Sequence, residues 1–287
     1  MRASSLSPIV FVLLTAACGG ASDHREYTLQ GQVLSVAADR REANIKHEAI
    51  AGFMPAMTMP YKAADAQEFA ELAPGDLINA TLVVVTDEAY LKDVRKVGEA
   101  PLEKAPGAAP ASSGFELLKP GEAVPNVQFV DQDGRKRDLA SVAHSTLLMT
   151  FIYTRCPMPT FCPLMDRNFA AIQGTLTTDP ALKNVHLVSI SFDPIADTPP
   201  VLKKHAAKVG ADPKYWTFLT GDRDEIDRFA ARFGVSITRP LNDPLDISHN
   251  LRTAIVDAGG ALVKAYTGNE WTPEQLLAET RQVAAKD

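Results

Sequence analysis

The chain has 287 residues, of which 46% are hydrophobic and 22% are charged, and its formal net charge is −6. This composition is ordinary for a folded chain and argues against a largely disordered protein, while the negative charge argues against nucleic acid as a partner. The length predicts about two domains, and three cysteines are too few for a disulfide-dense scaffold. The seven methionines are ordinary in number, but three of them lie within six residues.

The chain begins with a segment that is typical of an export signal. Arg2 gives a basic start, and the apolar residues 8–17 are, at about 1.5 Å per residue, too few to cross a hydrocarbon core of about 30 Å as a helix. The run LLTAAC resembles a bacterial lipobox, although Thr15 stands where that motif prefers Leu. We therefore expect residues 1–17 to be a lipoprotein signal peptide and Cys18 to be lipidated, with simple secretion and a buried N-terminal helix as alternatives. A lipidated Cys18 would anchor a bacterial protein to the membrane, in the periplasm or on the outer side of the cell membrane.

Residues 26–97 have the alternating hydrophobicity of short β-strands. Strand-like runs cover residues 27–33, 45–47, 78–84 and 90–97. Turn residues separate the first two runs, and several short strands joined by turns are typical of a small barrel or a sandwich. This first domain is therefore predicted to be all-β.

Residues 98–113 (GEAPLEKAPGAAPASS) are rich in Ala, Pro, Gly and Ser and lack an apolar period, which predicts a semi-extended linker. In residues 114–287, strands and helices alternate. Residues 145–154 and 185–192 are largely apolar, as in strands that are covered on both faces. Helix starts are predicted at Thr198, Asp222 and Thr272, and a hairpin is predicted over residues 252–266. The second domain is therefore a layered α/β domain.

Two sites rich in sulfur carry the functional interpretation, and the first lies in residues 47–59 (HEAIAGFMPAMTM). A methionine thioether is a soft, neutral ligand that suits Cu(I), and neutral imidazole also binds copper. Met57 and Met59 are two residues apart, so on a strand they share a face, and Met54 and His47 can be brought close to them. The alternative is that these methionines fill gaps in a core.

The run FMPAMTMPY, the upstream His47 and the PGD at residues 74–76 resemble periplasmic copper-binding domains of the CusF type. The resemblance implies a five-stranded barrel of the OB kind that binds Cu(I) through one His and two Met, with a Trp covering the metal. Carried over to this chain, the ligands are His47, Met57 and Met59. Met54 stands where the Trp would be, and it is a candidate third thioether.

The second site is Cys156-Pro-Met-Pro-Thr-Phe-Cys162, between an apolar strand and a helix. Pro163 suits the first turn of that helix, so Cys162 is expected near its positive end, where the helix dipole would lower the pKa of the thiol. Two converging thiolates can bind a soft metal or exchange with a disulfide. A permanent structural disulfide is the alternative in an exported protein.

Several runs in residues 116–285 resemble the SCO/SenC family. They are FIYTRCP, CPLMDRNF, VSISFDPIADTPP and SHNLRTAIVD. The resemblance implies a thioredoxin-like fold in which two Cys and one His hold copper. These ligands map to Cys156, Cys162 and His249, while Asp193 of the SFDP run is expected to support the site without binding the metal.

The chain departs from the family in the spacing of its cysteines. Five residues separate them where the family has three, and Met158 lies inside this longer loop as no more than an auxiliary contact. Asp197 is expected to help begin the helix at Thr198.

The function predicted from these sites is that of a copper chaperone rather than an enzyme. The family resemblance implies delivery of Cu(I) or Cu(II) to the CuA site of a respiratory oxidase subunit, and the linker would let the two sites meet and exchange copper. One alternative is a thiol–disulfide oxidoreductase that keeps target cysteines reduced, with Cys156 and Cys162 as its catalytic pair. Generic thioredoxins have two residues between their cysteines, so the spacing here favours metal binding. Another alternative is a resistance protein that buffers copper.

Overall fold

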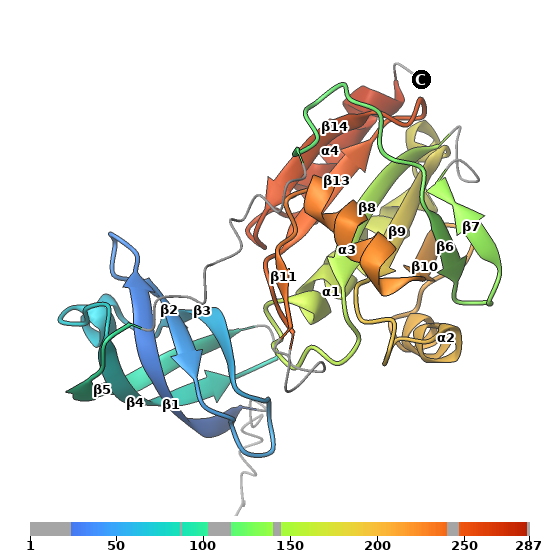
Figure 1. Ribbon diagram of the computed structural model, residues 1–287. Coiled ribbons are helices and arrows are strands. Elements are labelled where there is room, and N and C mark those ends of the chain that lie inside the picture. The colour runs from blue at the N-terminus through green and yellow to red at the C-terminus, as the bar shows by residue number, and fades with distance from the viewer. Residues whose placement is uncertain (1–23, 87, 103–115, 140–144, 240–246, 286–287) are drawn as a thin grey trace, which may run out of the picture.

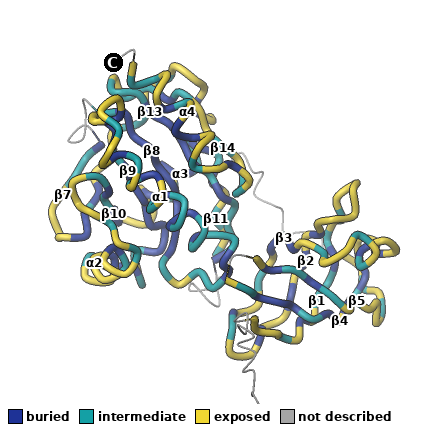
Figure 2. The backbone as a smooth tube through the Cα atoms, turned by 180° about the vertical axis from the view of Figure 1, so that it is seen from behind, coloured by how far each residue is buried: buried dark blue, intermediate teal, exposed yellow. Residues whose placement is uncertain are grey.

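The computed structural model describes residues 24–86, 88–102, 116–139, 145–239 and 247–285. Residues 1–17, Cys18 and most of the predicted linker lie outside these ranges. The N-terminal part forms a β-barrel, which lies beside a sheet covered by helices (Figure 1). Buried residues are concentrated in the strands of both parts, and many of the connecting loops are exposed (Figure 2). None of the described helices is long and apolar enough to cross a membrane.

The barrel closes in the order β1-β2-β3-β5-β4. Neighbouring strands are antiparallel except for β3 and β5, which are parallel. The closure agrees with the predicted small barrel, and its assignment to the OB kind stays a prediction. The elements are β1 (Arg25–Val36), β2 (Glu42–His47), β3 (Met57–Ala63), the short 3-10 helix η1 (Ala66–Phe69), β4 (Asp76–Val84) and β5 (Ala89–Glu99).

The predicted start of the linker at residue 98 is two residues too early. Gly98 pairs with Leu77 and Glu99 pairs with Asp76, so both residues belong to β5. Lys96 of β5 also lies 2.8 Å from the buried carboxylate of Asp76. These contacts extend the last strand into a stretch whose composition alone is typical of a linker.

Strands β1 and β2 approach each other closely next to His47. Ala43, Ile45 and His47 alternate along β2 and are all buried, and Gly31 of β1 is the register partner of His47. A Cβ atom on Gly31 would lie 2.7 Å from the carbonyl oxygen of Lys46 and 2.7 Å from Ile45 Cγ2. Because real Cβ atoms do not approach other heavy atoms so closely, glycine is required for this pairing.

The second part contains a seven-stranded sheet in the order β14-β13-β8-β9-β10-β6-β7. The three central strands β8, β9 and β10 are parallel, and every residue of β8 is buried, as predicted for a strand covered on both faces. The strands are β6 (Gln128–Asp131), β7 (Lys136–Asp138), β8 (Thr146–Ile152), β9 (Val185–Ser191), β10 (Trp216–Thr220), β13 (Arg252–Val256) and β14 (Leu262–Thr267). The pairing of β13 with β14 confirms the predicted hairpin.

Helices cover both faces of this sheet, which confirms the layered α/β prediction. Phe229 of α3 and Phe233, which follows this helix, contact Phe151 on one face, whereas Phe169 of α1 contacts Trp216 on the other. The helices are α1 (Cys162–Leu176), α2 (Pro199–Lys208), α3 (Arg223–Arg232) and α4 (Pro273–Ala284), with the 3-10 helix η3 (Pro180–Leu182) after α1. Asp222 and Thr272 cap α3 and α4 as predicted, the latter through a capping box.

Short strands were the elements that the sequence pattern missed. The hairpin of β6 and β7 and the pair β11 (Ile237–Thr238) and β12 (Ser248–His249) have two to four residues per strand. Strands this short show no measurable alternation. The second pair matters for function because it places His249 beside the loop that follows β8.

Candidate metal centre

Three separate elements bring Cys156, Cys162 and His249 together. Cys156 lies in the loop after β8, and His249 lies on β12. Cys162 is the first residue of α1, and Pro163 is the second. The Sγ atom of Cys162 lies 3.9 Å from Nε2 of His249. Both cysteines are free thiols in the structure, and the side chain of Cys162 hydrogen-bonds that of Cys156.

The imidazole of His249 is oriented as a metal ligand. Its Nδ1 lies 3.0 Å from the carbonyl oxygen of Asn250, which can only accept a hydrogen bond, so Nδ1 carries the proton. Nε2 therefore presents a lone pair toward Cys162. The rings of Phe192 and Tyr153 contact the imidazole with centroids 4.6 and 5.5 Å away. Removal from water lowers the pKa of His249 to about 4, so the ring is neutral at neutral pH.

The acidity of the two thiols is the reverse of the expectation from the helix dipole. Burial raises the pKa of Cys162 well above its usual value even though this residue begins α1. The hydrogen bond from Cys162 lowers the pKa of Cys156, which lies outside the helix. Desolvation is the largest cause of the raised pKa of Cys162, which is 2% exposed. Cys156 is the thiol that ionises first in this arrangement.

The separation of Cys162 and His249 is compatible with a shared metal ion. Typical metal–nitrogen and metal–sulfur bonds of about 2.0 and 2.3 Å place two ligands of one ion at most about 4.3 Å apart, and the observed separation is 3.9 Å. Within the described residues, no three His, Cys, Asp or Glu side chains already surround a metal position.

In the barrel, His47 has the same arrangement as His249. Its Nδ1 lies 2.7 Å from the carbonyl oxygen of Glu48, which again leaves a lone pair on Nε2. The residue is 2% exposed, and Nε2 has no hydrogen-bond partner within the part of the chain that the structure describes. Burial lowers the pKa of His47 as well. An unpartnered buried acceptor is costly unless something binds to it, and a soft metal ion fits this requirement.

Two of the predicted thioether ligands lie on the strand that pairs with the strand of this histidine. Met57 of β3 is the register partner of His47 of β2, and Met59 is two residues further along the same strand. Met54 is 4% exposed and forms an isolated bridge with Ile50 just before β3. The barrel therefore offers one imidazole and three thioethers in a largely apolar setting.

Two buried carboxylates hold the chain just before Cys156. Asp193 forms an ion pair with Arg155, whose Nη2 atom lies 2.6 Å from Oδ2, in line with its expected supporting role. Asp197 does not begin α2 as we expected. Its carboxylate accepts hydrogen bonds from the amide and hydroxyl of Thr154 and from the hydroxyl of Ser191, which joins the ends of β8 and β9.

The two sulfur-rich sites face one another across the boundary between the barrel and the sheet, whereas the sequence predicted only that the linker would let them meet. A cavity of about 20 Å³ lies between them. The residues that line it are Met54, Met57, Thr58 and Met59 of the barrel part, and Tyr153, Cys156, Pro157, Met158, Phe161, Ile247, Ser248 and His249 of the sheet part. No signal in the sequence sets the position of one part relative to the other.

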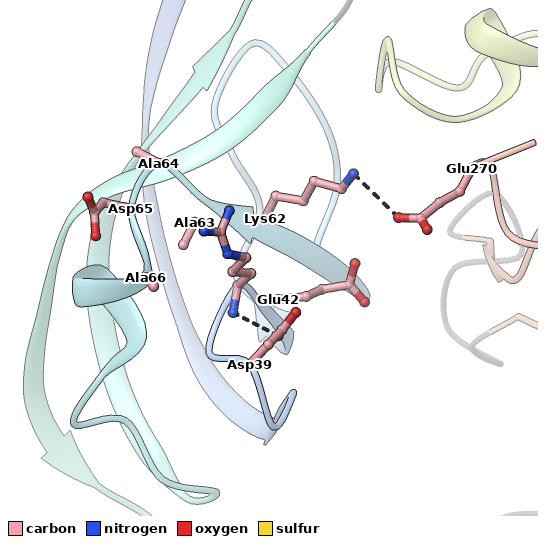
Figure 3. A pocket seen from close by; sticks show the side chains of 9 residues that line it. Asp39, Glu42, Lys62, Ala63, Ala64, Asp65, Ala66 and Glu270 are labelled. Atoms are coloured by element: carbon pink, nitrogen blue, oxygen red, sulfur yellow. Dashed lines mark hydrogen bonds and ion pairs between the residues drawn. The ribbon is translucent and has the colours of Figure 1, made fainter. Parts of the chain in front are cut away.

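Two polar contacts also join the barrel part to the sheet part. Ser248 of β12 donates a hydrogen bond of 2.9 Å to the carbonyl oxygen of Thr58 in β3. Nearby, Lys62 of β3 extends toward Glu270 with 3.8 Å between nitrogen and oxygen (Figure 3). This ion pair is exposed and contributes little by itself. The contact between the two parts therefore depends mainly on the buried side chains around the cavity.

The apoprotein is expected to lose stability as the pH falls from about 6.5 to about 4. His249 has a folded-state pKa of about 4, whereas an unfolded His titrates at about 6.5. Between these values the unfolded chain binds a proton that the folded chain does not, so the free energy of unfolding decreases with falling pH. Urea denaturation at about pH 7 and about pH 4.5 should show a smaller loss for His249→Gln than for the wild type. Equal losses in the two proteins would contradict this assignment.

Comparison with known families matches the two parts separately. Residues 118–285 match the family model described as SCO1/SenC, and residues 26–96 match the model described as Copper binding periplasmic protein CusF. A SCO1 protein homolog from Bacillus subtilis (strain 168) is 33% identical over 158 residues, which are 54% of this chain and 80% of the relative.

Two solved structures share the fold of the sheet part. A SCO1/SenC family lipoprotein from Bacillus anthracis superimposes with a TM-score of 0.52 and 27% identity, covering 58% of this chain and 99% of the other. BsSco, described with a disulfide switch and as a member of the Sco family of cytochrome c oxidase assembly proteins, superimposes with a TM-score of 0.50 and 28% identity, covering 60% and 99%.

Proposed function

Because the chain belongs to the SCO1/SenC family, we propose that it is an extracytoplasmic copper chaperone that delivers copper to the CuA site of a respiratory oxidase. The observation that carries the proposal is the pair of neutral histidines. His249 presents an Nε2 lone pair to the sulfur of Cys162, and His47 has a buried, unpartnered Nε2 within the described residues and Met57 as its register partner. The match to a copper-binding periplasmic family and the role of BsSco in a family of oxidase assembly proteins support it.

We assign two copper sites, one to each part of the chain. Cys156, Cys162 and His249 form the site of the thioredoxin-like domain at residues 114–287. His47, Met57 and Met59 form the site of the barrel, with Met54 as an additional thioether, and the residues between the end of β5 and residue 114 form the linker. Copper is the cargo of both sites. Neutral thioethers favour Cu(I), whereas the thiolates and imidazole accept Cu(I) or Cu(II).

We also propose that the chain is exported and lipidated at Cys18. The apolar segment before this residue has the length of the apolar core of a signal peptide, and a lipoprotein of the same family has a similar fold. An anchor on the outer side of the membrane would keep the copper sites close to membrane-bound oxidase subunits. Mass spectrometry of the protein from its bacterial host should show a diacylglyceryl group at Cys18.

The number of bound copper ions tests the two-site assignment. The purified chain is expected to bind two Cu(I) ions, one of which is lost in Met57→Leu/Met59→Leu and the other in Cys156→Ser/Cys162→Ser. Each double substitution removes two ligands assigned to one site and none of those assigned to the other. Anaerobic titration with metal analysis measures the stoichiometry, with Met149→Leu as a control in the core of β8. One copper ion that is insensitive to the methionine changes would exclude the barrel site.

A further inference from the structure

Met158 belongs to the sheet part by sequence but packs against the barrel. It lies in the loop between the cysteines, is 3% exposed, and is a member of the barrel's hydrophobic cluster together with Met54 and Met59. Cys156 and Phe161 of the same loop also pack against this cluster. The loop between the cysteines, which is longer than the family spacing, is therefore the segment of the sheet part that packs against the barrel's hydrophobic cluster.

The sheet part holds this loop in place. Arg167 of α1 donates a hydrogen bond of 2.9 Å to the carbonyl oxygen of Pro159, and Asn269 donates one of 2.6 Å to the carbonyl oxygen of Thr160. The amide of Phe161 also donates to the carbonyl oxygen of Met158 at 3.1 Å. These contacts fix the backbone from Met158 to Phe161, so the side chain of Met158 is presented to the barrel from a restrained position.

The cavity between the two sites suits a single soft ion. Its volume of about 20 Å³ is close to the space that one water molecule needs, about 10–15 Å³. Met158 lines it together with Met57 and Met59 from one site and Cys156 and His249 from the other. Thioether ligands bind Cu(I) without bringing a second charge into an apolar space, which limits the cost of desolvation.

We propose that Met158 is a Cu(I) ligand shared by the two sites, which holds the ion in this cavity while it passes from the barrel to the cysteines. The inference rests on the proposed copper chaperone function and adds to it an intermediate position inside the chain. Copper bound here would have thioethers of the barrel, the thioether of Met158 and the sulfur of Cys156 within reach.

The transfer is a series of ligand exchanges without a change in oxidation state. A bond between copper and Met57 or Met59 breaks as a bond to Cys156 forms, and Met158 remains bound during the exchange. The proton of the Cys156 thiol leaves to water, and copper stays Cu(I) throughout. A wider cleft of about 1240 Å³ adjoins the cavity at Met59, Met158 and His249 and gives that water access.

The test uses the full chain with its methionine methyl groups labelled with carbon-13. Cu(I) is added under anaerobic conditions, and each methyl resonance is assigned through its Met→Leu variant. We expect the Met158 resonance to shift together with those of Met57 and Met59, while Met149, in the buried strand β8, stays unshifted. An unshifted Met158 resonance alongside shifted Met57 and Met59 would overturn the inference and leave the proposed function standing.

Copper affinity provides a second readout that separates ligation from proximity. Met158→Leu conserves volume and is expected to fold, which the unchanged Met149 resonance verifies. Competition with a Cu(I) chelator should show at least about a 10-fold loss of affinity for one of the two ions, and none in Met149→Leu. Unchanged affinity in Met158→Leu would mean that this residue only packs. If the wild-type chain bound no Cu(I), the proposed function would fail together with the inference.

Discussion

Replacing His249 with alanine is expected to abolish tight copper binding at the cysteine pair while leaving the dithiol able to exchange with a disulfide. His249 supplies the only nitrogen ligand assigned to this site, and its neutral Nε2 lies 3.9 Å from Cys162 Sγ. Changes to residues that merely support ligands cost about 10–100-fold in metal affinity, so loss of the ligand itself should cost at least about 100-fold.

The same substitution discriminates the chaperone from the thiol–disulfide oxidoreductase. Exchange chemistry requires the sulfur atoms and their pKa values. The hydrogen bond from Cys162 is the largest cause of the pKa shift of Cys156, and burial is the largest cause of that of Cys162. Nearby backbone groups, Tyr153 and Asp166 contribute as well. His249→Ala should therefore leave the rate of reaction with a small disulfide within a few-fold of the wild-type rate.

His186→Ala is the matched control for this experiment. His186 is also a partly buried histidine of the sheet part, but its Nε2 bonds the hydroxyl of Thr217, away from the cysteines. This variant should bind copper as the wild type does. Copper affinity that survives in His249→Ala, or dithiol exchange that fails there, would show that His249 is not a dedicated metal ligand.

The sequence predicted the local framework of the centre because strong local signals specify it. The apolar run that became β8, the proline after Cys162 and the capping residues Asp222 and Thr272 each act over a few residues. Family resemblance placed His249 near the cysteines, which no local pattern could do.

What the sequence did not predict depends on burial and on contacts between distant segments. The pKa order of the thiols follows from the burial of Cys162, which a helix-dipole argument cannot include. The role of Asp197 follows from Thr154 and Ser191, which meet it only in the fold. The position of Met158 against Met54 and Met59 follows from the packing of the two parts on each other. Each of these is a property of tertiary structure and has no periodicity to reveal it.

Asp197→Ala is expected to lower the free energy of unfolding by about 3 kcal/mol or more. The carboxylate is fully buried and accepts from the Thr154 amide, the Thr154 hydroxyl and the Ser191 hydroxyl. Alanine would leave these donors without an acceptor, and each buried unsatisfied group costs about 1–3 kcal/mol. Urea denaturation measures the change.

Asp222→Ala provides the comparison because it also removes a carboxylate that accepts from the backbone. The exposed carboxylate of Asp222 accepts a hydrogen bond from the amide of Glu225 and so caps α3. Loss of such a cap costs about 1 kcal/mol of stability. Asp197→Asn keeps one oxygen acceptor and should fall between the two. A loss of stability in Asp197→Ala no greater than in Asp222→Ala would contradict the argument.

Asp197→Ala should also bind copper more weakly, because the Thr154 that it releases lies two residues before Cys156. Asp222→Ala should bind copper as the wild type does.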